Sequence, residues 1–254
     1  MKISIITVCY NSEEFIESAM QSVLSQTYQE IEYIIVDGLS KDSTPSRIEN
    51  SEQLFDGKMK WVSESDEGLY DAMNKGIKMA NGDIVGILNS DDFFYDDQVL
   101  SKVAKAFEDP SVQATIGDIV FVRDNDLNKV IRHYSAKNWK PSKFAWGYMP
   151  PHPSFFVRRE LFDQLGYYQT DYRIAADYEL LIRFLLKNRI NWKYLPIITT
   201  KMRMGGASTD GLKSLITLNK EIARGCQEND VYTNYAMIYS KYFFKPFEFL
   251  SKGK

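Results

Sequence analysis

The sequence lacks the features that mark several common classes of protein. Its 254 residues include only two cysteines, Cys9 and Cys226, which lie far apart and without the spacing of metal ligands. No apolar run reaches the roughly 18 residues of a membrane span, and the apolar start after Met1 is too short for a signal peptide. Basic residues form no block, the formal charge is −3 and the pI is near 5.6. These absences argue against a disulfide framework, an integral membrane protein and a nucleic-acid partner, and they favour a reducing, cytoplasmic location.

Strand-like and helix-like patterns alternate through the first ninety residues. The composition, 44% hydrophobic and 26% charged, is that of an ordinary globular protein. Apolar runs predict strands at 3–8, 31–36, 60–63 and 84–88, with helices between them at about 15–24, from Pro45 onward, and at about 68–80. This order predicts an α/β protein in which helices cover both faces of a parallel, Rossmann-like sheet.

The pattern changes beyond residue 92. A helical stretch at about 99–107 precedes strand-like segments at 114–122 and 130–133, and the proline-rich segment 149–153 then interrupts the backbone. A half that binds a nucleotide, followed by a half that binds another substrate, fits this change. No linker is long enough to separate two free domains.

The segment from Gly82 to Asp92 carries the strongest chemical signal. An apolar run ends there in two adjacent carboxylates, Asp91 and Asp92, with no basic neighbour. Two such groups repel one another unless a cation lies between them, and hard oxygen donors favour Mg²⁺ or Mn²⁺. A pair of aspartates that caps a helix is an equally good explanation of this segment alone.

Two further acidic residues are expected near the same edge of the sheet. Asp37 follows the second predicted strand, and Asp66 precedes the third predicted helix. Because the carboxyl ends of parallel strands share one edge, Asp37, Asp66 and Asp91 should converge there. Together they could bind a nucleoside and a metal-bound diphosphate. Taken singly, each is more often a turn or cap residue. Asn11, with Glu14 three residues later, predicts a capping-box start for the first helix.

Five segments in order carry a resemblance to a known family. They are residues 4–11 (SIITVCYN), 25–28 (SQTY), 32–38 (EYIIVDG), 68–76 (GLYDAMNKG) and 88–92 (LNSDD). The chain resembles the inverting glycosyltransferases of family 2, especially the branch that builds bacterial O-antigen and capsular polysaccharides. The resemblance covers roughly residues 1–210.

The resemblance implies a GT-A fold and a metal-dependent hexosyltransferase. Residues 1–92 would form the nucleotide-binding half and residues 93–210 the acceptor half, with a C-terminal helical extension at 211–254. A sugar would move with inversion from a nucleotide diphosphate donor, usually UDP-linked, to a growing cell-surface glycan on a lipid carrier. Mn²⁺ or Mg²⁺ would be the cofactor.

The resemblance also implies roles for individual residues. Asp37 and Asp66 would contact the nucleoside, and Asp91 would hold the metal. The first carboxylate of the family's Asp-x-Asp motif is here Asn89, which shifts the expected coordination toward Asp91 and Asp92. The complete set of expected donor-binding residues is Thr7, Tyr10, Asn11, Asp37, Asp66, Asn74, Lys75, Asn89, Ser90, Asp92 and Arg203.

Asp177 matches the position of the family's catalytic base. It lies near the start of an apolar helical stripe that runs from Ile174 to Leu186. A carboxylate at a helix N-terminus is stabilised in its ionised form, which can accept a proton. The residues alone fit an N-cap Asp nearly as well, with Glu179 in the first turn.

Two segments of the second half are further candidates for contact with substrate. His152 lies between prolines and could touch the metal, the diphosphate or the acceptor, although a loop histidine without a ligand fits equally well. Arg203 begins a glycine-containing segment through Ser208 that could close over a diphosphate. A plain turn before a helix is the alternative.

The C-terminal tail is rich in aromatic residues and lysine. From Tyr232 onward it contains eleven large apolar or aromatic side chains interleaved with lysines. Such a mixture suits peripheral contact with the inner face of the cytoplasmic membrane. Packing against the catalytic domain or another subunit is an equally common use of such a tail.

Two other functions compete with the transferase hypothesis. A sugar nucleotidyltransferase would need a glycine-rich basic loop after the first strand, where this chain has Cys9-Tyr10-Asn11. A glycan- or nucleotide-binding module without activity is conceivable because of Asn89. The presence of both Asp91 and Asp177 argues against it.

Overall fold

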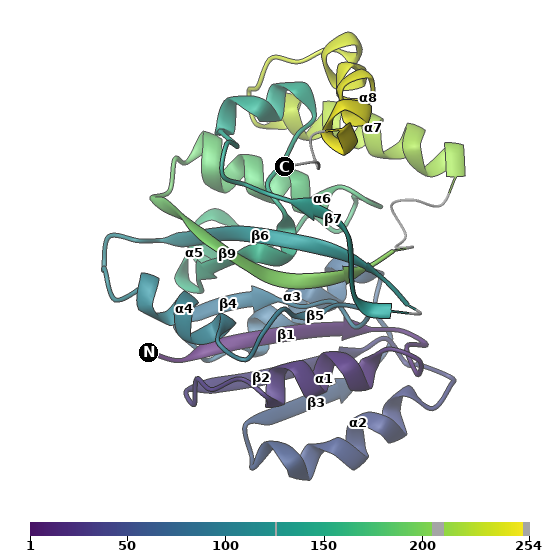
Figure 1. The fold of residues 1–254 in the computed structure, drawn as a ribbon, viewed down its shortest axis with the longest axis vertical. Coiled ribbons are helices and arrows are strands. Elements are labelled where there is room, and N and C mark those ends of the chain that lie inside the picture. The colour runs from purple at the N-terminus through teal and green to yellow at the C-terminus, as the bar shows by residue number, and fades with distance from the viewer. Residues whose placement is uncertain (125, 205–210, 251–254) are drawn as a thin grey trace.

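The structure is a computed structural model that describes residues 1–124, 126–204 and 211–250, without the side chains of 212 and 243–250. Nine strands among these residues form one sheet in the order β3-β2-β1-β4-β8-β6-β9-β5, and β7 pairs with β6 outside this path. Helices pack against both faces of the sheet (Figure 1). The predicted α/β architecture is confirmed.

The first half of the chain alternates strands and helices as its hydrophobic pattern predicts. Its four long strands all run parallel, and β1 lies between β2 and β4. Its elements are β1 (Ile3–Cys9), α1 (Ile16–Leu24), β2 (Ile31–Asp37), α2 (Thr44–Glu52), η1 (Gln53–Phe55), β3 (Met59–Ser63), α3 (Leu69–Met79), β4 (Ile84–Ile87) and β5 (Phe93–Phe94).

Side-chain alternation along β1 explains the two layers of helices. Ile3 and Ile5 belong to a core cluster with the buried residues of α1, α2 and α4. Ile6 and Val8 belong to a second cluster with α3 and the later helices. Successive side chains of a strand point to opposite faces, so β1 is buried on both sides. Each fully buried isoleucine contributes roughly 1.5–3 kcal/mol.

The second half extends the same sheet with mixed strand directions. β8 pairs antiparallel with β4 and β6, whereas β6 and β9 run parallel. Its elements are α4 (Val99–Ala106), β6 (Ala114–Arg123), β7 (Asp126–Tyr134), η2 (Pro141–Trp146), η3 (His152–Ser154), β8 (Phe155–Arg158), α5 (Glu160–Leu165), α6 (Ala176–Leu181), the π-helical segment η4 (Ile182–Lys187) and β9 (Trp192–Arg203).

The C-terminal extension consists of α7 (Gly211–Glu228) and α8 (Tyr235–Leu250), drawn in yellow-green and yellow at one end of the molecule (Figure 1). Ile222, Cys226 and Ile238 are fully or almost fully buried in the core cluster that also contains α6. The extension is therefore continuous with the core. None of the helices in the described part of the chain combines the length and apolar character needed to cross a membrane.

The prediction of a capping box at Asn11 and Glu14 is wrong. Helix α1 begins at Ile16, and no side chain caps it. Asn11 instead has a left-handed backbone with φ 49° and accepts a hydrogen bond from the Lys41 N–H over 2.9 Å. Asparagine tolerates this conformation, so the residue forms a turn that joins the loops after β1 and β2.

Candidate active site

The parallel strands bring the polar loops of the first half to one edge of the sheet. Cys9 lies opposite Asp37 in the register of β1 and β2, and Asp37 lies opposite Ser63 at the end of β3. The Leu88 N–H donates to the Ile6 carbonyl, so the chain leaves β4 at the same edge. The structure therefore brings the ends of the four strands together as the sequence predicts.

Asp37 lies at the centre of this edge and is fully buried. Its carboxylate accepts hydrogen bonds from the Ser40 hydroxyl and the Ser63 hydroxyl, each over 2.5 Å, and from the Ser40 N–H over 3.0 Å. The Cys9 thiol lies 3.6 Å away, and burial together with Asp37 raises its pKa. Asp37 thus ties the loop after β2 to the end of β3, and its expected contact with the nucleoside stays a prediction.

Asp66 and Tyr10 form the accessible part of the edge. Asp66 Oδ1 accepts the Gly68 N–H over 2.9 Å, and its Oδ2 lies 2.6 Å from the place where a Cβ on residue 38 would stand. Glycine at 38 is therefore needed for the carboxylate to lie against the backbone. The ring of Tyr10 also lies close to this Cβ position of residue 38, and Tyr10 is 58% exposed. An exposed aromatic face beside a carboxylate can receive a planar base.

Thr7 does not reach this accessible surface. Its side chain is fully buried in β1, and its hydroxyl accepts a hydrogen bond from the Tyr33 hydroxyl over 3.0 Å. Ser90, in contrast, lies within 3.0 Å of the Ser12 hydroxyl, where the loops after β1 and β4 meet. Of these two expected donor contacts, the geometry brings only Ser90 to the edge.

An open hollow of about 460 Å³ lies beside these loops, lined by Asn11, Glu13, Glu14, Phe15, Lys41 and Asp42. Three of its side chains are acidic and one is basic. A diphosphate would be repelled there, so the hollow is a poor place for the charged part of a nucleotide.

The acidic pair after β4 has the electrostatics of a cation site. Burial raises the pKa of Asp91, and burial together with the adjacent Asp91 raises that of Asp92 well above its ordinary value. Asp92 Oδ2 accepts the Asn89 side-chain amide over 3.1 Å, and its buried Oδ1 has no hydrogen-bond partner among the described residues. A divalent cation at the partly exposed Asp91 would relieve this repulsion.

A cation at this position would also need oxygens from a substrate. Within residues 1–124, 126–204 and 211–250, no three His, Cys, Asp or Glu side chains gather as a ready-made metal site. A divalent ion that is held by one or two carboxylates completes its coordination with phosphate oxygens and water. The residues present fit a metal that arrives with a diphosphate.

Arg203 lies close to the acidic pair at the end of β9. Its guanidinium stands over the rings of Phe15 and Phe93, 5.3 and 5.4 Å from their centroids, and donates to the Ser18 hydroxyl over 3.0 Å. Its charge lowers the pKa of Asp91 against the effect of burial. The arginine is thus held rigidly beside the expected diphosphate. The rest of the predicted glycine-containing segment, 205–208, lies outside the described residues.

A second cluster surrounds Asp177 at the start of α6. Burial raises the pKa of its carboxyl, and His152 and the Tyr70 hydroxyl act in the opposite direction. The helix N-terminus is expected to favour the ionised form of this carboxylate, and burial acts against that effect. Asp177 keeps some exposed surface. A carboxylate with a raised pKa and access to solvent is suited to accept a proton near neutral pH.

His152 is buried rather than presented to solvent. Its Nε2 lies 2.7 Å from the Tyr168 hydroxyl, and burial lowers its pKa, which favours the neutral ring. Tyr168 in turn stacks on Tyr70 with 5.7 Å between ring centroids. The structure thus places His152 beside Asp177 in a buried aromatic cluster, and its expected role as a metal ligand stays a prediction.

The side chains of Asn74 and Lys75 bind backbone groups of the loops beside the two clusters. The Asn74 amide donates to the Tyr168 carbonyl over 2.8 Å and accepts the Tyr168 N–H over 2.9 Å. Lys75 donates to the Ser65 carbonyl over 2.7 Å and pairs with Glu64. Asn74 and Lys75, which are expected to contact the donor, therefore hold the loops that carry Tyr168 and Asp66.

Sequence reasoning missed Tyr70 and Tyr168. Tyr70 lies one helical turn before Asn74 on α3, and its hydroxyl donates to the Ile174 carbonyl over 2.5 Å. The spacing of four residues places Tyr70 and Asn74 on one face of the helix, and this is the signal that could have identified Tyr70. No local pattern marks Tyr168.

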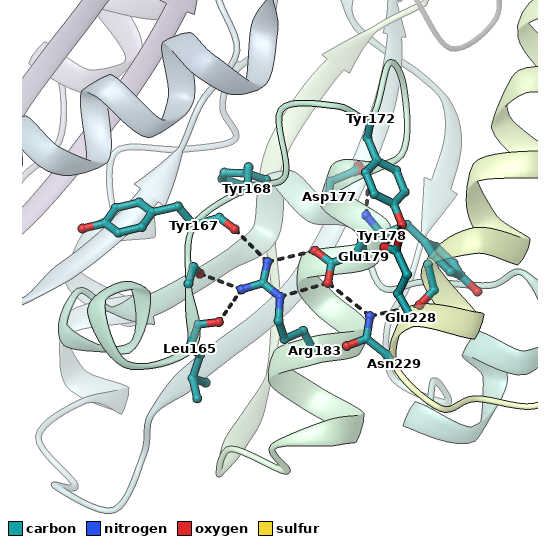
Figure 2. A network of polar contacts seen from close by, with 12 residues as sticks. Leu165, Tyr167, Tyr168, Tyr172, Asp177, Tyr178, Glu179, Arg183, Glu228 and Asn229 are labelled. Carbon is teal, nitrogen blue, oxygen red and sulfur yellow. Dashed lines mark hydrogen bonds and ion pairs between the residues drawn. The ribbon is translucent and has the colours of Figure 1, made fainter.

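Glu179 has a structural role. Arg183 binds it through two hydrogen bonds of 2.9 and 2.8 Å and also donates to the carbonyls of Leu165, Gly166 and Tyr167 (Figure 2). Both carboxylate oxygens are thereby occupied, and the residue is buried. Asp177 is the accessible carboxylate of α6.

The mixed sheet with helices on both faces has the architecture of the glycosyltransferases with a GT-A fold. The chain belongs to glycosyl transferase family 2, whose sequence model matches residues 4–172. The resemblance inferred from the sequence is confirmed.

Relatives and solved structures agree with this assignment. An uncharacterized glycosyltransferase of Mycobacterium tuberculosis is 33% identical over 72% of this chain and 69% of its own length. A glycosyltransferase of PGL/p-HBAD biosynthesis from Mycobacterium bovis is 27% identical over 81% of this chain and 78% of its own length.

Solved structures share the GT-A fold. Staphylococcus aureus TarS 1-349 in complex with UDP-GlcNAc superposes with a TM-score of 0.72 over 98% of this chain and 73% of its own, at 18% identity. The mannosyltransferase PcManGT of Pyrobaculum calidifontis, in complex with GDP-Man and Mn²⁺, gives 0.68 over 98% and 72%, at 20% identity.

Proposed function

We propose that this glycosyltransferase is metal-dependent and inverting, and that it moves a sugar from a UDP-linked donor to a lipid-linked glycan of the cell envelope. The observation that carries the proposal is the position of α3 between two carboxylate clusters. Asp66 lies just before this helix at the donor edge, and Tyr70 in its first turn binds the chain segment that carries Asp177. The two clusters are thereby adjacent and distinct.

Each cluster has the chemistry for one part of the transfer. Tyr10 and Asp66 would receive the nucleoside, while Asp91 and Arg203 would lie at the diphosphate. The metal, when bound at Asp91, would neutralise charge on the departing diphosphate. Asp177 would accept the proton of the acceptor hydroxyl as its oxygen bonds to the anomeric carbon and the bond to the diphosphate breaks. No enzyme nucleophile is required.

The nature of the donor and the cofactor rests on the neighbours named above. One was solved with UDP-GlcNAc and another with GDP-Man and Mn²⁺. Asp66 beside Tyr10 is compatible with UDP, since a carboxylate can accept the N3–H of uracil. We propose that residues 1–92 bind the donor and residues 93–210 bind the acceptor, although both halves contribute to one sheet.

The acceptor proposal rests on the relative from PGL/p-HBAD biosynthesis and on the exposed tail. Tyr232, Tyr235 and Tyr239 are 79%, 53% and 38% exposed, and the last two rings lie 6.3 Å apart. Exposed tyrosines beside lysines suit the interface of a membrane, where a lipid-linked acceptor would be met. The expected contributions of 243–250 fall on side chains outside the described set.

A thermal-shift and turnover panel tests the proposal. UDP, GDP, UDP-GlcNAc, UDP-glucose and UDP-galactose would be added with Mn²⁺, with Mg²⁺ or with a chelator. A nucleotide at a hundred times its dissociation constant stabilises by about 2.7 kcal/mol, and slow release of UDP reports hydrolysis. A shift by UDP that needs the metal is expected. Stabilisation by GDP alone would contradict the donor assignment.

A further inference from the structure

Helix α6, which carries Asp177, begins without a capping side chain of its own. The residue at its N-cap is Ala175, which has no side-chain acceptor. The turn that leads into the helix presents three successive N–H groups, those of Arg173, Ile174 and the N-cap Ala175. Such groups need acceptors when they are not exposed to water.

Glu221 of α7 supplies those acceptors. One oxygen accepts the Arg173 N–H over 2.8 Å, and the other accepts those of Ile174 and Ala175, each over 2.9 Å. Hydrogen bonds to an ionised carboxylate are shorter and stronger than neutral ones. The turn that precedes Asp177 is therefore fixed by Glu221, which lies 44 positions after Asp177 in the chain.

The rest of α7 fastens the same segment on both sides of Asp177. Arg224 pairs with Asp171 and stands 4.2 Å from the centroid of the Tyr172 ring. The Tyr172 hydroxyl donates to Glu228 over 2.6 Å (Figure 2). At the far side, Asn229 donates to Glu179 over 3.1 Å. On the opposite side of the turn, Tyr70 of α3 binds the Ile174 carbonyl.

We infer that Glu221 is a positioning residue for Asp177, so that the C-terminal extension completes the active site. The inference rests on the proposed function of Asp177 as the base. The family model ends at residue 172, before both residues, so family membership does not supply this role. A displacement of about 1 Å at a reacting group can cost roughly a hundredfold in rate. A turn that is fixed through three N–H groups resists such a displacement.

The experiment compares four variants of the full chain. Glu221→Ala removes both acceptor oxygens and with them all three hydrogen bonds, and Glu221→Gln keeps the side-chain length with one oxygen acceptor. Lys220→Ala is the matched control, because Lys220 is the exposed neighbour on the same helix. Asp177→Asn is the reference for loss of the base. UDP release from UDP-GlcNAc, UDP-glucose or UDP-galactose with Mn²⁺ gives kcat, and calorimetry with UDP gives donor affinity.

Glu221→Ala should lower kcat roughly 10- to 100-fold while UDP affinity stays at the parent's value. Glu221→Gln should recover part of the rate, and Lys220→Ala should match the parent. Amide hydrogen exchange at residues 173–175 should accelerate most in Glu221→Ala, less in Glu221→Gln and not in Lys220→Ala. Unchanged kcat with faster exchange, or unchanged exchange, would overturn the positioning role.

The outcomes also separate this inference from the proposed function. If Asp177→Asn lowers kcat and Glu221→Ala does not, the inference fails and the proposed base stands. If Asp177→Asn retains the parental rate, or the parent releases no UDP from any of the three donors, the proposed function fails. The role of Glu221 then fails with it.

Discussion

Asp177 is set apart from its acidic neighbour by what surrounds each carboxylate. Both carboxylate oxygens of Glu179 accept hydrogen bonds from Arg183. Asp177, in contrast, retains exposed surface, and burial raises its pKa. Because a base is needed for transfer and not for holding the donor, Asp177→Asn should lower kcat by roughly 10²- to 10⁴-fold with donor affinity unchanged. Steady-state rates and calorimetry with UDP measure the two quantities.

Glu179→Gln provides the contrasting variant for that prediction. It weakens a buried ion pair, so it should lower the melting temperature more than the Asp177 variant does. A loss of only a fewfold in kcat for Asp177→Asn would assign that residue to the local structure of α6. A parallel loss of UDP affinity would show that the start of α6 shapes the donor pocket.

At the donor edge, Asp91 is the carboxylate that a cation can reach. Asp92 is buried and already holds the Asn89 amide. Asp91→Asn removes one charge at a partly exposed position, so the metal-dependent part of UDP affinity should fall while the fold stays intact. Calorimetry with and without Mn²⁺ measures this, and Asp97→Asn, at an exposed acid six residues on, should match the parent. Equal metal dependence in all three proteins would remove Asp91 from the metal site.

At the scale of elements, one buried carboxylate connects several strands. Glu32 of β2 accepts hydrogen bonds from the Ser4 hydroxyl and the Asn81 N–H and pairs with Lys60 over 2.9 Å. Burial alone would raise the pKa of Glu32, but these partners outweigh it and lower the value to about 2. The strands β1, β2 and β3 and the start of β4 are thereby held at their amino ends.

This depressed pKa predicts how acid affects stability. A carboxyl whose pKa is lower in the folded state stabilises fully above its unfolded value, near 4.5, and loses that contribution as pH falls toward 2. Glu32→Gln should therefore melt at a lower temperature than the parent at pH 7, and the difference should shrink below pH 4.5. Glu30→Gln, at an exposed neighbour, is the control. A difference that stays constant across this pH range would contradict the assignment.

The loop after β2 approaches Asp66 closely at Gly38. A Cβ at this position would stand 2.6 Å from Asp66 Oδ2, so Gly38→Ala should displace the carboxylate and weaken UDP binding. Because Asp66 is the flexible end of a side chain, the melting temperature should change little. A double-mutant cycle with Asp66→Ala measures the coupling by calorimetry. Independent effects of the two changes would show that Gly38 acts elsewhere.

The element scale also shows what the sequence can predict. The β-branched runs of β1 and β2 and the amphipathic pattern of α3 depend on local spacing, and they were predicted within a few residues. Asn11 was misjudged because its side chain binds Lys41, thirty residues away. The roles of Tyr168 and Glu221 were missed for the same reason. Contacts between distant segments leave no periodic trace in one sequence, although the order of strands predicted that the polar loops would share an edge.

At the scale of the whole molecule, the C-terminal extension contacts the rest of the protein through both of its helices. Helix α7 binds the segment that carries Asp177, and α8 packs through Ile238, which is fully buried. The Tyr242 hydroxyl donates to Asn219 of α7 over 3.1 Å, which joins the two helices. A surface formed at α8 is therefore connected through α7 to the turn before Asp177. Binding of the extension to a membrane would bring the acceptor side of the enzyme to the lipid.

The exposed tyrosines provide a test of this connection without disturbing the core. Replacement of Tyr232, Tyr235 and Tyr239 by serine removes three aromatic side chains that are already exposed, so the melting temperature should stay close to the parent's. Flotation with anionic liposomes should be lost, because burial of the rings in the interface drives binding. UDP release without acceptor should be unchanged. Leu54→Ser, at a 62% exposed residue of η1, is the control for loss of an exposed apolar group. If the parent does not float, or if the triple variant floats as well as the parent, the tyrosines do not bind membrane and α8 acts only by packing.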